Sequence, residues 1–255
     1  MRFASLGSGS QGNALLVEAH TTRVLLDCGF GLAETTRRLA RIGVAPSDLS
    51  AIVVTHEHQD HIGGAARFAR KHGLPVWLTA GTLRGLEGLF DPDVEVRLIR
   101  GYSSFSIGDI CIDPFPVPHD AREPAQYVFG DGACRLGVLT DAGHVTPHMR
   151  HCLSGCDALV LECNHDAEML RTGAYPELLK ARISSRLGHL DNEAAAGLLA
   201  GLDLSQLQHV VAAHMSVSNN RPELARNALA AALGCAAHWI EVADQQAGLG
   251  WRQLA

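Results

Sequence analysis

Short runs of consecutive apolar residues, rich in valine, isoleucine and leucine, recur along the 255-residue chain. Runs of this kind, without polar alternation, are typical of strands that are covered on both faces. The pattern therefore predicts buried strands at residues 23–27, 51–55, 134–140, 158–162 and 209–213.

Apolar residues recur at helical spacing between several of these runs, and strands that alternate with helices predict an α/β fold. Residues 94–140 instead carry strand patterns separated by short turns, which favours hairpins and therefore a mixed sheet. No linker or repeat interrupts the pattern, so we expect a single domain over residues 1–255. The predicted helices span residues 32–42, 62–72, 176–187, 192–199 and 222–233.

The composition narrows the class of protein. Hydrophobic residues make up 47% of the chain and charged residues 19%, which excludes a disordered protein. The net charge of −6 argues against a broad basic surface for nucleic acid but leaves a locally bound phosphate ester open. Seven cysteines without a CxxC pair, and no signal-like or membrane-length apolar run, predict a cytoplasmic protein with no membrane partner.

Histidine or a carboxylate residue follows most of the predicted strands. Because polar side chains at strand ends converge on one rim of a sheet, this is where an α/β enzyme places its site. A surface role at each strand end is the alternative, but it does not explain why histidine and aspartate recur. These residues are Asp27, His56, His119, Asp141, Glu162 and His214.

The segment from His56 to His61 has the pattern His-x-His-x-Asp-His, with His58 and Asp60 between its ends. Imidazole and carboxylate groups bind zinc, iron and manganese, so the segment predicts ligands for two divalent metal ions. One segment supplies too few ligands for two sites, and distant residues must complete them. His119, Asp141 and His214 are the candidates, with Asp141 bridging the metals and Asp27 orienting a ligand.

Together these residues resemble the metallo-β-lactamase superfamily across nearly the whole chain. The resemblance implies an αββα sandwich, in which two mixed sheets lie between helical layers, and a hydroxide between two metal ions as the nucleophile. It further implies that His56, His58 and His119 hold one metal ion, that Asp60, His61 and His214 hold the other, and that Asp141 bridges them.

Five further segments resemble the bacterial YycJ/WalJ family, which implies a DNA exonuclease that acts from the 5′ end. Two small departures from the family pattern are Cys163 and Asp191, neither of which is a presumed ligand. The segments are residues 6–13, 116–121, 162–166, 188–192 and 214–220.

Glu162 and His189 are similar to a glutamate and a histidine that assist leaving-group protonation in ribonuclease Z. Phosphodiester cleavage needs a general acid near the departing sugar oxygen. We therefore expect His189 to donate the proton and Glu162 to orient the His189 ring. The alternative is that His189 caps the following helix and Glu162 is a solvated strand end. With Asp60 from the metal motif, these residues are the catalytic candidates.

Two segments offer groups that could bind a substrate phosphate. The glycine-rich loop at residues 7–13 could present backbone N–H groups to an anion, although a tight turn needs the same glycines. Asn220 is expected to cap the helix that starts near Pro222, where phosphate can also bind. His165 is either a phosphate contact or a buried histidine. The candidate substrate-binding residues are Ser8, Ser10, Asn13, His165, Asn219, Asn220 and Arg221.

The leading hypothesis is therefore a two-metal phosphodiesterase that trims DNA from its 5′ end. The alternative is a hydrolase of the same fold that acts on a small cyclic phosphodiester, thioester or lactone. The negative net charge favours the alternative slightly, because a nuclease attracts a polyanion. The Glu162 and His189 pair favours the phosphodiesterase, because a thioester or lactone needs less help to release its leaving group. The pattern distinguishes neither DNA from RNA nor one oligomeric state from another.

Overall fold

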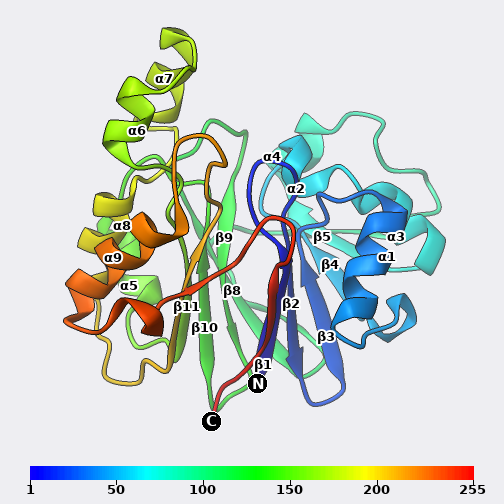
Figure 1. The fold of residues 1–255 in the computed structure, drawn as a ribbon. Helices are drawn as coiled ribbons and strands as arrows, with labels where there is room; N and C mark the ends of the chain where they lie inside the picture. Colours follow the sequence, from blue (N-terminus) through cyan, green and yellow to red (C-terminus); the bar gives the residue numbers. More distant parts are fainter.

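The computed structural model describes residues 1–255 and contains two seven-stranded sheets that lie face to face (Figure 1). In order, the first sheet consists of β14 (Leu249–Gln253), β1 (Arg2–Gly7), β2 (Ala14–Ala19), β3 (Thr22–Leu26), β4 (Ala51–Val53), β5 (Val76–Thr79) and β6 (Val96–Ile99). The second consists of β13 (Glu241–Val242), β12 (His209–Ala213), β11 (Ala158–Glu162), β10 (Arg135–Leu139), β9 (Ala125–Gly130), β8 (Ile110–Pro116) and β7 (Phe105–Ile107).

Both sheets are mixed, as the sequence predicts. In the first sheet, β14 to β3 pair antiparallel and β3 to β6 pair parallel. In the second, β7 to β10 form an antiparallel meander and β10 to β13 pair parallel. The predicted hairpins of the middle third are thus confirmed for β7 to β10, whereas β6 joins the other sheet beside β5.

Helices cover the outer face of each sheet (Figure 1). The first sheet is flanked by α1 (Leu32–Arg41), α2 (Gln59–Ile62), α3 (Ala65–His72) and α4 (Ala80–Gly85). The second is flanked by α5 (Pro147–Leu153), α8 (Asn192–Leu199) and α9 (Pro222–Leu233), while α6 (Ala167–Thr172) and α7 (Glu177–Ile183) stand above the rim. Short 3-10 turns cover residues 46–48 and 237–239. None of the helices has the length and apolar character to cross a membrane.

The continuous apolar runs are explained by the four layers. Successive strand residues point to opposite faces, so Val24 enters the core between the sheets while Leu25 packs beneath the helices of the first sheet. In the second sheet Val160 likewise enters the core between the sheets, and Leu161 packs beneath the helices on the outer face. Because both faces of these strands are covered, their apolar runs are continuous, and polar residues stand only near the strand ends. The predicted αββα sandwich is confirmed.

Two predicted helices are shorter in the structure. The helix expected over residues 62–72 is divided into α2 and α3, because the Gly64 N–H donates to the Cys28 carbonyl at 2.8 Å instead of to a helical partner. A side chain at Gly64 would also overlap with the Phe30 carbonyl. The helix expected over residues 176–187 ends at Ile183, whose carbonyl accepts a hydrogen bond from the His189 N–H.

The buried Arg38 connects α1 to β1 and to the loop that precedes β14. The side chain of Arg38 is 3% exposed, and its Nη1 donates to the carbonyls of Leu6 and Gln245 at 2.7 and 2.8 Å. Replacing Arg38 by alanine removes the donor to the Gln245 carbonyl and leaves the Leu6 carbonyl with only the longer contact from Arg41, at 3.4 Å. We therefore expect the free energy of unfolding to fall by about 3 kcal/mol. The neighbouring Arg37→Ala serves as a matched control, because Arg37 is exposed and pairs only with Glu34. Urea denaturation that found both variants equally stable would contradict this role for Arg38.

Candidate metal centre and active site

The candidate site lies where strands of both sheets end on the same rim. Three residues that lie one or two positions beyond a strand end, Asp27, Asp141 and His214, have positive φ angles of 59°, 52° and 52°. Only one other non-glycine residue in the chain, His20, has a φ in this range. Such a backbone is unfavourable for residues with a side chain and persists where surrounding contacts hold it. The strain at three strand ends therefore marks this rim as the functional region.

Asp27 and Thr55 hold the histidine loop that follows β4. The Asp27 carboxylate accepts from the Thr55 N–H at 2.8 Å, and its second oxygen lies 2.7 Å from Nδ1 of His61. Both Asp27 and His61 are buried. Since Nδ1 of His61 is engaged by the carboxylate, its Nε2 is directed to the other site residues.

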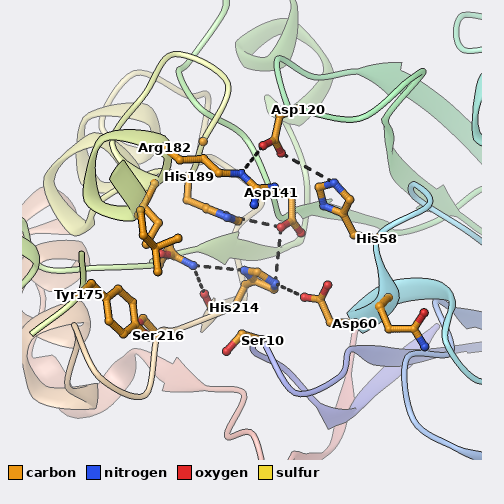
Figure 2. Close-up of a pocket in the computed structure, with 15 residues that line it drawn as sticks. Ser10, His58, Asp60, Asp120, Asp141, Tyr175, Arg182, His189, His214 and Ser216 are labelled. Atoms are coloured by element: carbon orange, nitrogen blue, oxygen red, sulfur yellow. Dashed lines mark hydrogen bonds and ion pairs between the residues drawn. The ribbon is translucent and has the colours of Figure 1, made fainter. Parts of the chain in front are cut away.

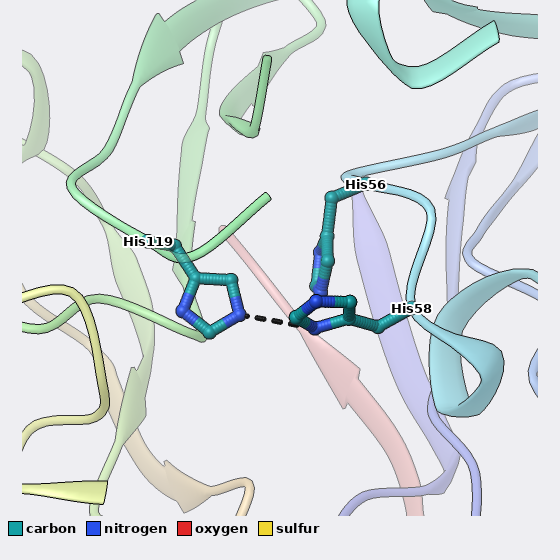
Figure 3. Close-up of side chains that lie close together, drawn as sticks. All are labelled: His56, His58 and His119. Carbon is teal, nitrogen blue, oxygen red and sulfur yellow. Dashed lines mark hydrogen bonds between the residues drawn. The ribbon is translucent and has the colours of Figure 1, made fainter. Parts of the chain in front are cut away.

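The seven candidate ligands, together with Glu162 and His189, form four overlapping groups, and the donor atoms within each group lie within 4.8 Å of one another. His56, His58 and His119 form one group (Figure 3), and Nε2 of His119 lies 3.2 Å from Nδ1 of His58. The remaining groups all contain His61 or His214, and Asp141 belongs to two of them. These are Asp60 with His61 and His214, then His56 with His61 and Asp141, and finally Asp141 with Glu162, His189 and His214.

The donor atoms in these groups fit divalent metal ions. Nε2 of His56 is buried and has no hydrogen-bond partner, which is costly for a polar atom unless another group binds it. Oδ2 of Asp141 is also buried and lies 3.1 Å from Nε2 of His61 without the angle of a hydrogen bond. Imidazole nitrogens and carboxylate oxygens are the donors that zinc, manganese and iron accept. The site therefore suits one or more of these ions.

The charged states of the site residues depend on one another. Burial would raise the pKa of Asp141, but the imidazoles of His214 and His61 outweigh it and hold that pKa well below its usual range. Burial would lower the pKa of His214, but Asp141, Asp60 and Glu162 together raise it to about 10. Metal ions must therefore displace protons when they bind here. In contrast, burial lowers the pKa of His56, which leaves its ring neutral.

Glu162 holds His189 at the edge of this cluster. Oε1 of Glu162 lies 2.7 Å from Nδ1 of His189, and Oε2 accepts from the N–H groups of Ala142 and Leu190. Glu162 is fully buried, so it is not a solvated strand end. The cap of α8 is Asp191, whose carboxylate accepts from Ala194 at 2.7 Å. His189 is therefore free of the capping role that the sequence left open.

A cavity of about 400 Å³ opens above these residues (Figure 2). His189 and Asp141 lie in it side by side, at 3.5 Å, and Asp60 and His214 lie below them. Burial would lower the pKa of His189, but Glu162 and Asp141 raise it, which favours the protonated ring. The site thus combines candidate metal ligands with a proton donor in one accessible space.

The structure places Ser8, Ser10 and Asn13 differently from one another. Only Ser10 lines the cavity. The buried Ser8 hydroxyl accepts from the His214 N–H at 2.9 Å, and Nδ2 of Asn13 donates to the Asp60 carboxylate at 3.3 Å. In this structure Ser8 and Asn13 position ligand residues rather than face the cavity.

The other candidate substrate contacts also lie outside this cavity. The Asn220 side chain is buried and bonds to Asn192 and to the Cys163 carbonyl. Arg221, and not Asn220, occupies the N-cap position of α9, so the expected cap was wrong; Asn220 instead accepts from the Arg221 N–H. Asn219 and His165 are likewise buried.

Sequence reasoning missed several residues that line the cavity. Asp120 directly follows the candidate ligand His119 and lies inside a family-like segment, so its position offered a signal. Tyr175 and Arg182 offered none, because they reach the cavity only through the placement of α7 above the rim. Asn164, whose Nδ2 donates to the His214 carbonyl at 3.1 Å, was also missed.

Comparison with known proteins agrees with this architecture. The sequence model of a beta-lactamase superfamily domain matches residues 22–215. The chain is 39% identical over 228 residues to exodeoxyribonuclease YycJ of Bacillus anthracis, covering 89% of this chain and 86% of that protein. It is 36% identical over 229 residues to exodeoxyribonuclease WalJ of Streptococcus pneumoniae strain D39, covering 88% of this chain and 85% of that protein. The metallo-beta-lactamase fold protein YhfI from Bacillus subtilis superposes with a TM-score of 0.77 at 14% identity over 99% of each chain.

Proposed function

Because this chain belongs to the beta-lactamase superfamily and to its YycJ/WalJ family, we propose that it is a metal-dependent exodeoxyribonuclease that removes nucleotides from the 5′ end of DNA. The observation that carries the proposal is the position of His189. This histidine is held by a buried glutamate and lies 3.5 Å from Asp141, the carboxylate shared by two of the ligand groups. A proton donor so close to the ligand cluster suits cleavage of an unactivated phosphodiester.

His56, His58 and His119 would hold one metal ion, and Asp60, His61 and His214 would hold a second, with Asp141 between them. When bound, such ions neutralise charge on the phosphate and make water a stronger nucleophile. Asp27 and Asn13 contribute by holding His61 and Asp60 in place.

The chain's own groups handle the proton of the leaving group. His189 donates a proton to the departing sugar oxygen, and Glu162 stabilises the protonated ring before that transfer. Because the two backbone N–H groups of Ala142 and Leu190 hold the other Glu162 oxygen, the carboxylate cannot rotate away from His189.

Digestion of linear duplex DNA labelled at its 5′-phosphate tests the proposal. With manganese, we expect the wild-type protein to release labelled mononucleotides and His61→Ala to release none. Folding of the variant is checked by circular dichroism, because His61 is fully buried.

Labelled oligonucleotides in place of mononucleotides would contradict exonuclease action from this end. No release of label by folded, metal-loaded protein would contradict the nuclease proposal itself. Hydrolysis of a cyclic dinucleotide or a thioester under those conditions would then favour a small-molecule hydrolase.

A further inference from the structure

Apart from its histidines, the cavity has one cationic and one aromatic residue, and both come from the same short segment. Of the residues that line it, Arg182 is the only lysine or arginine and Tyr175 is the only phenylalanine, tryptophan or tyrosine. Both belong to residues 175–183, which include α7 above the rim of the sheets (Figures 1 and 2). Both side chains therefore line the cavity and come from one short segment of the chain.

Arg182 has most of its hydrogen-bonding capacity free. Its Nε donates to Oδ2 of Asp120 at 2.6 Å, whereas its two terminal nitrogens make no hydrogen bond within the protein. The side chain is 62% exposed. A guanidinium whose terminal N–H groups are free matches the oxygens of a phosphate in a two-pronged contact.

Asp120 fixes where this guanidinium lies. Its Oδ2 accepts from Arg182, and its Oδ1 lies 3.5 Å from Nε2 of His119 and 3.8 Å from Nε2 of His58. One carboxylate thus joins Arg182 to the histidine cluster. An anion bound by Arg182 would therefore lie beside the candidate metal centre, at the position of a phosphate that neighbours the scissile one.

Tyr175 offers a surface for a nucleobase. Its ring is half-buried at the cavity wall, and its hydroxyl makes no hydrogen bond within the protein. No residue of α7 is buried, and Leu178 beside it is 88% exposed, so this wall is open to a strand that approaches from solvent. Aromatic rings at such positions stack on bases without regard to sequence.

We propose that Arg182 binds a non-scissile phosphate of a polynucleotide substrate, while Tyr175 stacks on an adjacent base. This inference rests on the proposed function and adds the residues that select a nucleic-acid strand over a small phosphodiester. Arg182 would give a chain of net charge −6 one local contact for a phosphate of a polyanion.

Kinetics of DNA digestion with Arg182→Ala, Arg182→Lys and Tyr175→Ala test the proposal, with Arg171→Ala as the matched control. Arg171 lies on the neighbouring α6, is 70% exposed and pairs with Glu168 outside the cavity. We expect Arg182→Ala and Tyr175→Ala each to raise KM for DNA about tenfold. Arg182→Lys should recover part of this loss. Arg182→Ala should reduce the slope of log affinity against log salt concentration by the amount that about one phosphate contact contributes.

Two further measurements separate this inference from the proposed function. The loss caused by Arg182→Ala should be far smaller with bis(p-nitrophenyl) phosphate, which has no neighbouring phosphate, than with DNA. Binding of a fluorescent phosphorothioate oligonucleotide should weaken in Arg182→Ala whether or not DNA is cleaved. If Arg182→Ala and Arg171→Ala bind the oligonucleotide equally, with equal salt dependence, the inference is wrong even where digestion occurs.

Discussion

Replacing Asp141 by asparagine is expected to lower DNA hydrolysis on the order of a thousandfold and to reduce the metal content of the purified protein. Asp141 is buried, and its two oxygens lie 3.1 Å from His61, 3.5 Å from His214 and 3.8 Å from His119. Asp141 is the one carboxylate that lies within 4 Å of imidazoles from both ligand groups. Asparagine keeps the size of the side chain but removes the charge that attracts metal ions.

The variant is measured by elemental analysis of bound metal and by turnover of DNA. Asp93→Asn is the matched control, because Asp93 is exposed on a loop and does not line the cavity. Asp141→Asn also removes the negative charge that raises the pKa of His61 and His214. Full metal content and full activity in Asp141→Asn would exclude Asp141 as a bridging ligand.

His189→Ala is expected to lower kcat for DNA by about a hundredfold to ten-thousandfold while the protein keeps its metal. The reason is that His189 supplies a proton, and the three groups that contain the seven candidate ligands remain complete without it. An activated leaving group needs no proton, so bis(p-nitrophenyl) phosphate should lose much less activity. His151→Ala, on the exposed face of α5, is the matched control. Equal losses with both substrates would refute the role of His189 as proton donor.

The pH profile supplies a second measure of the same pair. Although burial opposes it, Glu162 raises the pKa of His189, so the protonated ring persists below that raised pKa and is lost as pH rises through it. DNA hydrolysis should therefore fall on the alkaline side. Glu162→Gln removes the charge that stabilises the protonated ring, and the alkaline fall in kcat should move to lower pH. An unchanged profile would show that Glu162 does not act through His189.

Whether the site favours a nucleic-acid strand or a small molecule depends more on Arg182 and Tyr175 than on the ligand groups and the Glu162 and His189 pair. The ligand groups and the Glu162 and His189 pair could act on any phosphodiester that reaches them. Arg182 and Tyr175 distinguish a strand with neighbouring phosphates and bases from an isolated diester. Variants of Arg182 or Tyr175 are therefore expected to change the substrate preference, whereas variants of the candidate metal ligands are expected to abolish hydrolysis.

The sequence by itself determined that buried strands alternate with helices, and it determined the composition of the candidate centre, whereas the four layers followed from the family resemblance. Strands covered on both faces carry continuous apolar runs, so the runs at residues 51–55 and 158–162 identified β4 and β11. The helices at residues 192–199 and 222–233 match in full, because Asp191 and Pro222 provide local start signals. The histidine motif was recognisable since its residues are contiguous.

Only the tertiary structure decided which polar side chains reach the cavity. Ser8 and Asn13 look like substrate contacts in a glycine-rich loop, yet their hydrogen bonds turn inward to His214 and Asp60. Arg182 carries no local signal, and it meets Asp120 across 62 residues of chain because α7 lies above the rim. The direction of a side chain depends on packing between distant segments, and periodicity along the chain carries no information about it.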